Sequence, residues 1–341
     1  MTGGALWSVA ACAPLVFAAS LAAQHTPVEE AWALLAKDQR PQAIRLLYDI
    51  VRTDPSNADA RLLLGSVLQE EGDAAGSIAQ LTEAVKLRPG SAEAQNALGE
   101  GFKAAGDSKR ARGPFEKAVA LDGKLAPAQL NLGLVLLEAG ELDEAGKHLD
   151  RAIELLGRKP DAAYPHYLRA KVSTGQNDLG EAVGHLQQAV TLRPDFAEAW
   201  SDLGNARQAL LDQAGALSAF ERAVSLDPDD AVAQTRIGSL LLEQGKTHLA
   251  AMHLREAARV DPTNQSSLYI LQRALREDGQ AAEAEGIKQK LSQLLRDKDR
   301  DDQNLLAGIQ LNNQGADLEK AATGARRCKS IGRPWSCCLA T

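Results

Sequence analysis

The sequence is poor in aromatic residues: Phe, Trp and Tyr make up only 4% of its 341 residues, although 45% of them are hydrophobic. Alanine and leucine supply the apolar content instead. Because Ala and Leu favour helices, whereas aromatic and β-branched residues favour strands, this composition predicts closely packed helices rather than a sheet.

Positive charge is scarcer than negative charge, with 38 Lys and Arg against 45 Asp and Glu, for a net charge of −7. No basic stripe with interleaved aromatic residues appears, so the sequence does not predict nucleic-acid binding. It also lacks a Gly-x-Ser-x-Gly elbow, a Walker-type phosphate loop and a His-Glu-x-x-His motif. We therefore expect no catalytic residues, no cofactor and no metal site.

Charged side chains are absent from the first 23 residues. The apolar run there ends in small residues, with Ser20 and Ala22 placed for cleavage before Ala23, which predicts a signal peptide at 1–23. The run has no Lys or Arg ahead of it and contains Pro14. A membrane anchor at 5–23 and a wrongly chosen start codon are the alternatives. We expect an exported protein, periplasmic or secreted, which contacts the membrane only if this segment is retained.

What the sequence does have is a period of 34 residues. Prolines recur at this interval at Pro55 and Pro89, and again at Pro194, Pro228 and Pro262. Aligned on them, the chain divides into seven units, 58–91, 92–125, 126–162, 163–196, 197–230, 231–264 and 265–298, preceded by a degenerate unit at 24–57 and followed by a tail at 299–341. The unit 126–162 is three residues longer, and we expect the extra residues to lengthen a surface loop.

The columns of this alignment predict how each unit folds. Small residues recur at unit positions 8, 20 and 27, and a bulky residue recurs at position 24. This pattern favours two antiparallel helices, because small residues let the backbones approach and the bulky residue fills the space between them. Glycines fall at the turn between the two helices, where they can take the left-handed conformation; these are Gly72, Gly106, Gly140, Gly245 and Gly279.

These columns resemble the tetratricopeptide repeat (TPR) family. The unit 197–230 carries the family pattern of Trp, Leu-Gly, Ala, Phe, Ala and Pro at Trp200, Leu203, Gly204, Ala216, Phe220, Ala223 and Pro228. It departs from the pattern at Leu210, where an aromatic residue is commoner, and it lacks the turn glycine. The resemblance covers roughly 27–298. It implies an all-α fold, a right-handed superhelix of antiparallel helix pairs whose first helices line a concave groove for partner peptides.

In this family the groove is lined by positions 2, 5, 9, 12 and 13 of the first helix. These positions become apolar in the unit 126–162 and aromatic in the next unit, which favours a partner-binding site there. The expected contact residues are Leu130, Leu134, Leu137, Tyr164, Tyr167 and Lys171, with Tyr269, Arg273 and Arg276 in the last unit. The alternative is that the leucines are core, because "NLGLVLL" is apolar all round.

Two specialised sites are not expected. Some TPR proteins clamp a terminal carboxylate with Lys at position 5 and Asn at position 9 of one unit, but here Asn205 is accompanied by Ser201. His148, His185 and His253 share position 23. Equivalent residues of neighbouring helix pairs should lie at least about 8–10 Å apart, whereas a zinc ion needs each ligand nitrogen at about 2.0–2.1 Å from it. We therefore do not expect these three histidines to share a zinc ion.

The tail leaves the pattern. Residues 306–322 resemble the first helix of one more unit, which indicates either a terminal cap or a truncated or frame-shifted gene. Cys328, Cys337 and Cys338 are the only cysteines beyond the first 23 residues, and an exported protein could bridge Cys328 to one of the other two.

The sequence therefore predicts a non-catalytic scaffold for a protein or peptide partner. The alternatives are the repeat region of a truncated glycosyltransferase-like enzyme, which the resemblance allows, and a membrane-tethered assembly factor. A tail of 43 residues is too short for an independent catalytic core.

Overall fold

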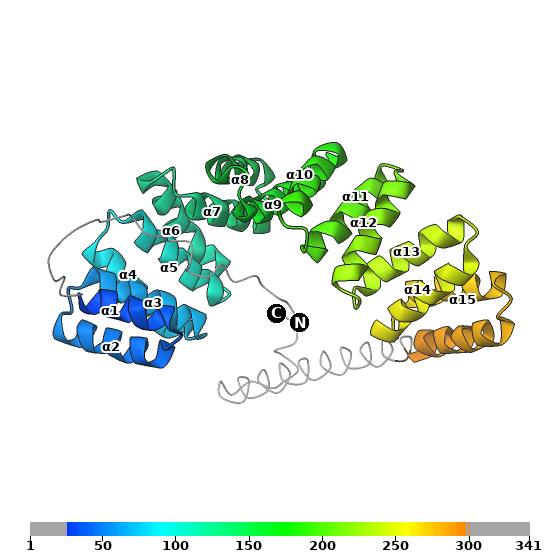
Figure 1. The fold of residues 1–341 in the computed structure, drawn as a ribbon, viewed down its shortest axis with the longest axis horizontal. Coiled ribbons are helices and arrows are strands. Elements are labelled where there is room, and N and C mark those ends of the chain that lie inside the picture. Colours follow the sequence, from blue (N-terminus) through cyan, green and yellow to red (C-terminus); the bar gives the residue numbers. More distant parts are fainter. Residues whose placement is uncertain (1–25, 298–299, 301–341) are drawn as a thin grey trace, which may run out of the picture. The chain divides into compact units, whose positions relative to one another are not determined.

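The computed structural model describes residues 26–297 and residue 300, and within this part the regular elements are helices (Figure 1). In chain order they are α1 (Pro27–Ala36), α2 (Arg40–Thr53), α3 (Ala58–Glu70), α4 (Ala74–Leu87), α5 (Ala92–Ala104), α6 (Ser108–Leu121), α7 (Ala126–Glu138), α8 (Leu142–Leu156), the 3-10 turn η2 (Pro160–Ala162), α9 (Ala163–Gly175), α10 (Leu179–Leu192), α11 (Ala197–Ala209), α12 (Gln213–Leu226), α13 (Ala231–Glu243), α14 (Thr247–Val260), α15 (Gln265–Glu277) and a helix over 281–297.

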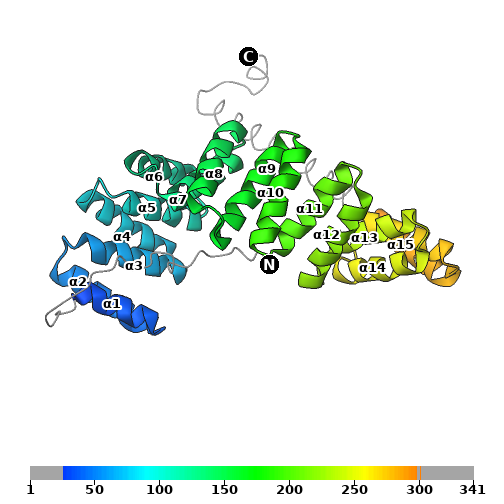
Figure 2. The ribbon, with the colours of Figure 1, turned by 45° about the horizontal axis from the view of Figure 1, so that its top comes forward.

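The chain divides into two compact units, residues 1–216 and 217–341. In the first unit, α3 pairs with α4, α5 with α6, α7 with α8, and α9 with α10, and each second helix contacts the first helix of the next pair (Figure 2). First helices also contact one another, α3 with α5, α5 with α7, and α7 with α9. In the second unit α14 packs on both α13 and α15. The predicted all-α array of helix pairs is confirmed.

The packing between the two helices of a pair follows the predicted small and bulky columns. Position 8 is Gly99 in α5, and a Cβ added there would lie 2.5 Å from the Phe115 ring of α6. Gly133 stands in the same relation to Leu149, at 2.7 Å. Phe115 and Leu149 are fully buried. The glycine therefore makes room for the bulky residue at position 24.

The turn between the two helices has a left-handed residue at unit position 15. Glycine holds this position in five units, with φ between 74° and 83°, as the sequence predicts. Where glycine is missing the backbone is still left-handed, at Asp38, Asn177 and Leu211, with φ of 58°, 62° and 65°. The turn geometry is therefore imposed by the packing of the pair and not by glycine itself.

Several first helices begin at a side-chain cap directly after the loop that carries the periodic proline. Asn57 Oδ1 accepts from the Ala60 amide at 2.9 Å, and Ser91 Oγ accepts from the Ala94 amide at 3.1 Å. Asp230 and Asn264 cap α13 and α15 in the same way. These caps satisfy amides that have no partner within the helix.

The three additional residues of the unit 126–162 lie between α8 and α9. The helix α8 ends at Leu156 and is capped by Gly157, which has φ of 64°, and η2 follows before α9 begins at Ala163. The sequence predicts a lengthened loop here, and the structure resolves it into a left-handed glycine and one 3-10 turn.

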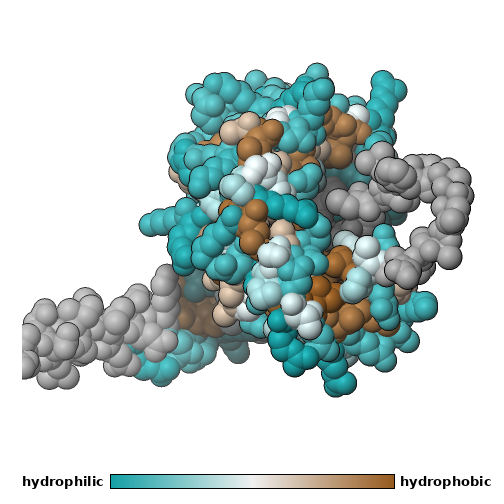
Figure 3. Space-filling view, turned by 90° about the vertical axis from the view of Figure 1, so that its left-hand side faces the viewer, coloured by the Kyte–Doolittle hydropathy of each residue, from teal (hydrophilic) through white to brown (hydrophobic). Residues whose placement is uncertain are grey.

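Among residues 26–297 and residue 300, no helix combines the length and hydropathy needed to cross a bilayer. Figure 3 shows one face of the molecule, on which hydrophobic side chains form separate patches among hydrophilic ones. The predicted signal peptide, the anchor at 5–23, the partial helix at 306–322 and Cys328, Cys337 and Cys338 lie outside the described residues.

Candidate partner-binding site

The leucines of α7 divide between the core and its edge. Leu130 is only 6% exposed and belongs to the hydrophobic cluster of the first unit, which fits the core interpretation for this residue. Leu134 and Leu137 are half-buried and pack against that cluster, as do Tyr164 and Tyr167 of α9. We call Leu134, Leu137, Tyr164 and Tyr167 the Leu–Tyr edge, because each packs on the core and keeps part of its surface in solvent.

The tyrosines of this edge are held by other rings. The Tyr164 and Tyr167 rings are stacked, with centroids 6.2 Å apart and an interplanar angle of 27°, and Tyr167 lies 4.9 Å from the Phe196 ring. Burial raises the pKa of both tyrosines, so they stay protonated at neutral pH. The edge therefore presents neutral aromatic surface that is already positioned.

Lys171 lies one turn beyond Tyr167 on α9 and is engaged on two sides. Its Nζ is 4.9 Å from the centre of the Tyr167 ring and 3.3 Å from Asp202 Oδ2 of α11. Burial by itself would lower the pKa of Lys171, but Asp202 and Tyr167 outweigh it and the pKa is raised. Lys171 is therefore a charged residue that is already paired.

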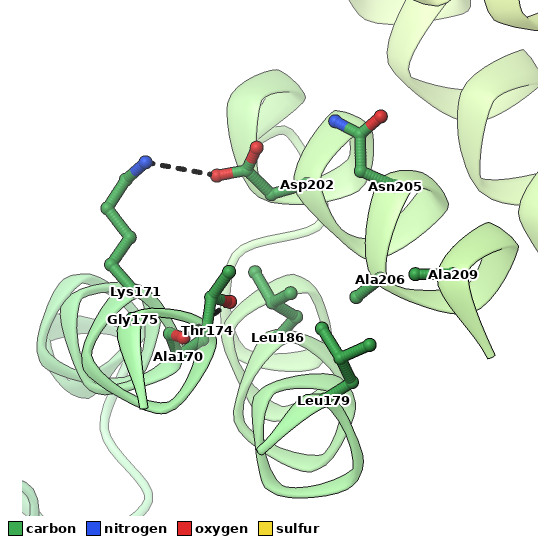
Figure 4. Close-up of a pocket in the computed structure, with 10 residues that line it drawn as sticks. All are labelled: Ala170, Lys171, Thr174, Gly175, Leu179, Leu186, Asp202, Asn205, Ala206 and Ala209. Carbon is green, nitrogen blue, oxygen red and sulfur yellow. Dashed lines mark hydrogen bonds and ion pairs between the residues drawn. The ribbon is translucent and has the colours of Figure 1, made fainter. Parts of the chain in front are cut away.

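A pocket of about 510 Å³ lies among α9, α10 and α11 beside this ion pair (Figure 4). It has the size of an ordinary ligand site. Its apolar lining includes Leu179 and Leu186 of α10, which point into the space between the other two helices. Its remaining lining residues are Ala170, Lys171, Thr174, Gly175, Asp202, Asn205, Ala206 and Ala209. We call this the α9–α11 pocket.

The sequence predicts only Lys171 of this pocket as a contact residue. Asp202 and Ala206 are at positions 6 and 10 of their unit, outside the family's groove positions. The sequence does contain a signal for this pocket, which is the number of small residues where α9 and α11 approach α10. These residues leave space that larger side chains would fill; they are Ala170, Gly175, Ala206 and Ala209.

A polar cluster on α5 and α7 adjoins the edge. Glu100 Oε1 accepts from Asn96 Nδ2 at 3.0 Å and from Asn131 Nδ2 at 2.9 Å, and Asn131 lies one turn from Leu134. Burial raises the pKa of Glu100, although the two carboxamides and Lys103 act in the opposite direction. Asn131 of α7, with Asn96 and Glu100 of α5, thus forms a polar surface beside the apolar residues of the Leu–Tyr edge.

The other predicted contact residues lie on α15, in the second unit. Tyr269 is 65% exposed. Arg273 is exposed and its Nε donates to Glu277 at 2.8 Å, while Arg276 is exposed one turn further along the helix. They form a separate basic and aromatic surface of that unit.

The position-23 histidines pair with position 4 of their own unit. Nδ1 of His148 lies 2.7 Å from Gln129 Oε1, and Nδ1 of His253 lies 2.8 Å from Gln234 Oε1. His185 instead faces His166, with 2.9 Å between the two Nδ1 atoms. No group of three potential metal ligands occurs in the part of the chain that the structure describes.

The side chain at unit position 4 can also hydrogen-bond the loop that precedes its unit. Gln129 Nε2 donates to the Gly123 carbonyl at 3.0 Å, and Trp200 Nε1 donates to the Pro194 carbonyl at 3.0 Å. Position 4 is not among the columns of small and bulky residues that predict the helix pair. The signal was present in the recurring 19-residue interval between a position-4 glutamine and a position-23 histidine.

Two family models, both described as tetratricopeptide repeat, match the chain, one over residues 124–195 and the other over 28–92, 63–126 and 167–231. Together they cover more than half of the sequence. A search of curated proteins found no significant match.

Solved structures agree with the fold. The structure of Pseudomonas aeruginosa pilF aligns with a TM-score of 0.56 at 20% identity, covering 63% of this chain and 96% of that one. A tetratricopeptide repeat protein from Parabacteroides merdae aligns with a TM-score of 0.51 at 14% identity, covering 73% and 97%. The matched models, the 34-residue columns and the paired helices lead to one conclusion: this chain belongs to the tetratricopeptide repeat family.

Proposed function

We propose that the chain is a non-catalytic scaffold that binds a protein or peptide segment along its first helices, in the concave groove that its family implies. The main contacts are on α7 and α9. The observation that carries this proposal is the Leu–Tyr edge, in which aliphatic and aromatic side chains are half-exposed while the core beneath them holds their positions.

Such an edge suits recognition for two reasons. Tyrosines are enriched among the few residues that carry most of the binding energy in typical interfaces, and the half-exposed leucines beside them add apolar surface that a partner can bury. Rings that are already stacked also lose little conformational freedom on binding, so more of the contact energy remains as affinity. The exposed Tyr269, Arg273 and Arg276 provide a second contact surface in this proposal.

The test is substitution of the edge without damage to the core. A library of 12-residue segments, each fused at both ends to a phage coat protein, is selected for binding to the full chain. The affinity of the enriched segments for each variant is then measured by titration. Leu134→Asp should weaken binding at least tenfold while the helical circular dichroism stays unchanged, because Leu134 is at the edge of the core.

Leu249→Asp is the matched control, since Leu249 is an exposed leucine on a second helix, α14. It should bind as the unmodified chain does. Equal losses in both variants would refute binding along the first helices, and so would loss of fold together with binding in Leu134→Asp.

Export is part of the proposal and is supported by the uncharged apolar run at 1–23. Expression of the full gene in a bacterium, followed by fractionation and N-terminal sequencing, tests it. A soluble periplasmic or secreted chain that begins near residue 23 supports export, whereas a chain in the cytoplasm that keeps Met1 contradicts it.

A further inference from the structure

The α9–α11 pocket differs in chemistry from the Leu–Tyr edge. Its floor and walls are mainly aliphatic, from Leu179 and Leu186 on α10 and from the alanines of α9 and α11, and the Thr174 hydroxyl of α9 is already bonded to the Ala170 carbonyl at 2.9 Å. Polar side chains gather at the mouth, where Lys171, Asp202 and Asn205 lie (Figure 4). An apolar floor below a few placed polar groups is the usual composition of a specific binding site.

The charges at the mouth cancel each other. The ion pair between Lys171 Nζ and Asp202 Oδ2 joins α9 to α11 across the opening, and the Tyr167 ring holds Lys171 from the other side. A carboxylate that approached Lys171 would have to displace Asp202, and a cation that approached Asp202 would have to displace Lys171. The mouth therefore disfavours charged groups of either sign.

The third polar group at the mouth is the Asn205 carboxamide, which makes no side-chain hydrogen bond within the described part of the chain. A carboxamide offers both an N–H donor and a carbonyl acceptor, which is the complement of one peptide unit. Asn205 lies one helical turn from Asp202 on α11, at the same mouth. It can thus hold a peptide backbone whose side chain enters the apolar floor.

We propose that the α9–α11 pocket takes one uncharged apolar side chain from within a peptide segment, and that Asp202 excludes a chain-terminal carboxylate by engaging Lys171. Asn205 hydrogen-bonds the backbone of the bound residue. Asp202 is the residue that sets this preference, because without it Lys171 and Asn205 would flank the mouth as a cation and a hydrogen-bond donor. The inference rests on the proposed peptide binding and specifies its ligand.

Two phage libraries of 12-residue random segments test the proposal on the full chain. One is fused at both ends, and the other ends in a free carboxylate. The unmodified chain should enrich the doubly fused library, in segments that share one Leu, Ile, Met or Phe. Enrichment of free-carboxylate segments alone would overturn the proposal.

Variants then locate the bound residue. Ala206→Leu adds three carbon atoms to the pocket wall, takes up part of the space that the bound side chain needs, and should weaken binding of an enriched segment at least tenfold, with unchanged circular dichroism and thermal midpoint. Asp202→Asn should shift enrichment toward free-carboxylate segments by at least about tenfold, because it releases Lys171. If Ala206→Leu does not fold, the Asp202→Asn shift still decides, and its absence contradicts the proposal.

The outcomes separate this inference from the proposed function. Segments that lose affinity in Leu134→Asp but not in Ala206→Leu would leave the scaffold function intact and refute the pocket. If neither library is enriched on the unmodified chain, both proposals fail.

Discussion

The Nδ1 atoms of His166 and His185 lie 2.9 Å apart, at positions where two other units pair a glutamine with a histidine. One ring can donate to the other only if at least one of them is neutral. Burial and the neighbouring His185 lower the pKa of His166 to about 4, and burial, with Arg169, lowers the pKa of His185. Asp150 and Glu181 oppose the effect on His185.

This pair should make the stability of the first unit depend on pH. The pKa of His166 is about 4 in the folded chain and about 6.5 when unfolded, so the folded state binds fewer protons between these values. Stability is therefore full above pH 6.5 and falls as pH drops toward 4. Because the rings are only half-buried and partly screened, we expect a loss of about 1–2 kcal/mol.

His166→Gln restores the pairing of the other units and is the direct test. Urea unfolding of both chains between pH 7.5 and 4.5 gives the difference in free energy, in which the titration of shared carboxylates cancels. The free energy of unfolding of the variant, relative to that of the unmodified chain, should increase as pH falls. Parallel curves would show that the pair does not titrate as described.

Leu211 should be a site where glycine stabilises the chain. It has φ of 65°, its amide donates to the Gln208 carbonyl at 2.9 Å, and its side chain is 85% exposed. The left-handed conformation costs a residue with a Cβ about 1–2 kcal/mol, and the exposed side chain contributes little burial. Leu211→Gly should raise the free energy of unfolding by about 1 kcal/mol after the greater freedom of glycine in the unfolded chain is subtracted.

The reverse change is the control. Gly106 occupies the same unit position with φ of 77°, and Gly106→Leu should destabilise by a similar amount. Thermal and urea unfolding measure both. Destabilisation by Leu211→Gly would mean that the leucine side chain makes contacts that offset its backbone strain.

Replacing a helical glycine with alanine should destabilise the chain where the new methyl group would meet buried atoms, and stabilise it where the space around the glycine is open. In Gly99→Ala the new Cβ would lie 2.5 Å from Phe115, and the buried ring would have to move. Overpacking of this kind costs about 1–3 kcal/mol, which exceeds the gain in helix propensity of up to about 1 kcal/mol. Gly184 of α10 is exposed and has open space around it, so Gly184→Ala should stabilise. Urea unfolding that ranks the two the other way would contradict the packing described here.

Glu100 should lower stability when it is ionised. Burial raises its pKa above the ordinary 4.5. The contribution of the protonated side chain to folding stability is therefore fully present below pH 4.5 and is lost as pH rises through the folded pKa. Glu100→Gln keeps an acceptor for Asn96 and Asn131 and should stabilise the chain at pH 7 but not at pH 4. Glu198→Gln, at an exposed position on α11, is the control and should change little. Equal effects of Glu100→Gln at the two pH values would contradict this account.

The repeat was predictable because its information is local to each unit. The contact of Gly99 with Phe115 joins unit positions 8 and 24, and such columns recur often enough to be recognised in one sequence. The turn at Leu211 was harder, because the missing glycine gives no sign that the backbone keeps its left-handed conformation.

The candidate site was predictable only in part. Tyr164, Tyr167 and Lys171 follow from family positions on one helix. The pocket depends on the separation of α9 and α11, and thus on how neighbouring units pack, and Asp202 becomes important only because it reaches Lys171. No single column of the repeat carries that information.

Hydrogen exchange on the full chain, with and without a saturating enriched 12-residue segment, tests the central claim most directly. The account predicts slower exchange in α7, α9 and α11, with α8 and α14 unchanged. Slower exchange confined to second helices such as α8 and α14, or no change in α7 and α9 at saturation, would contradict it.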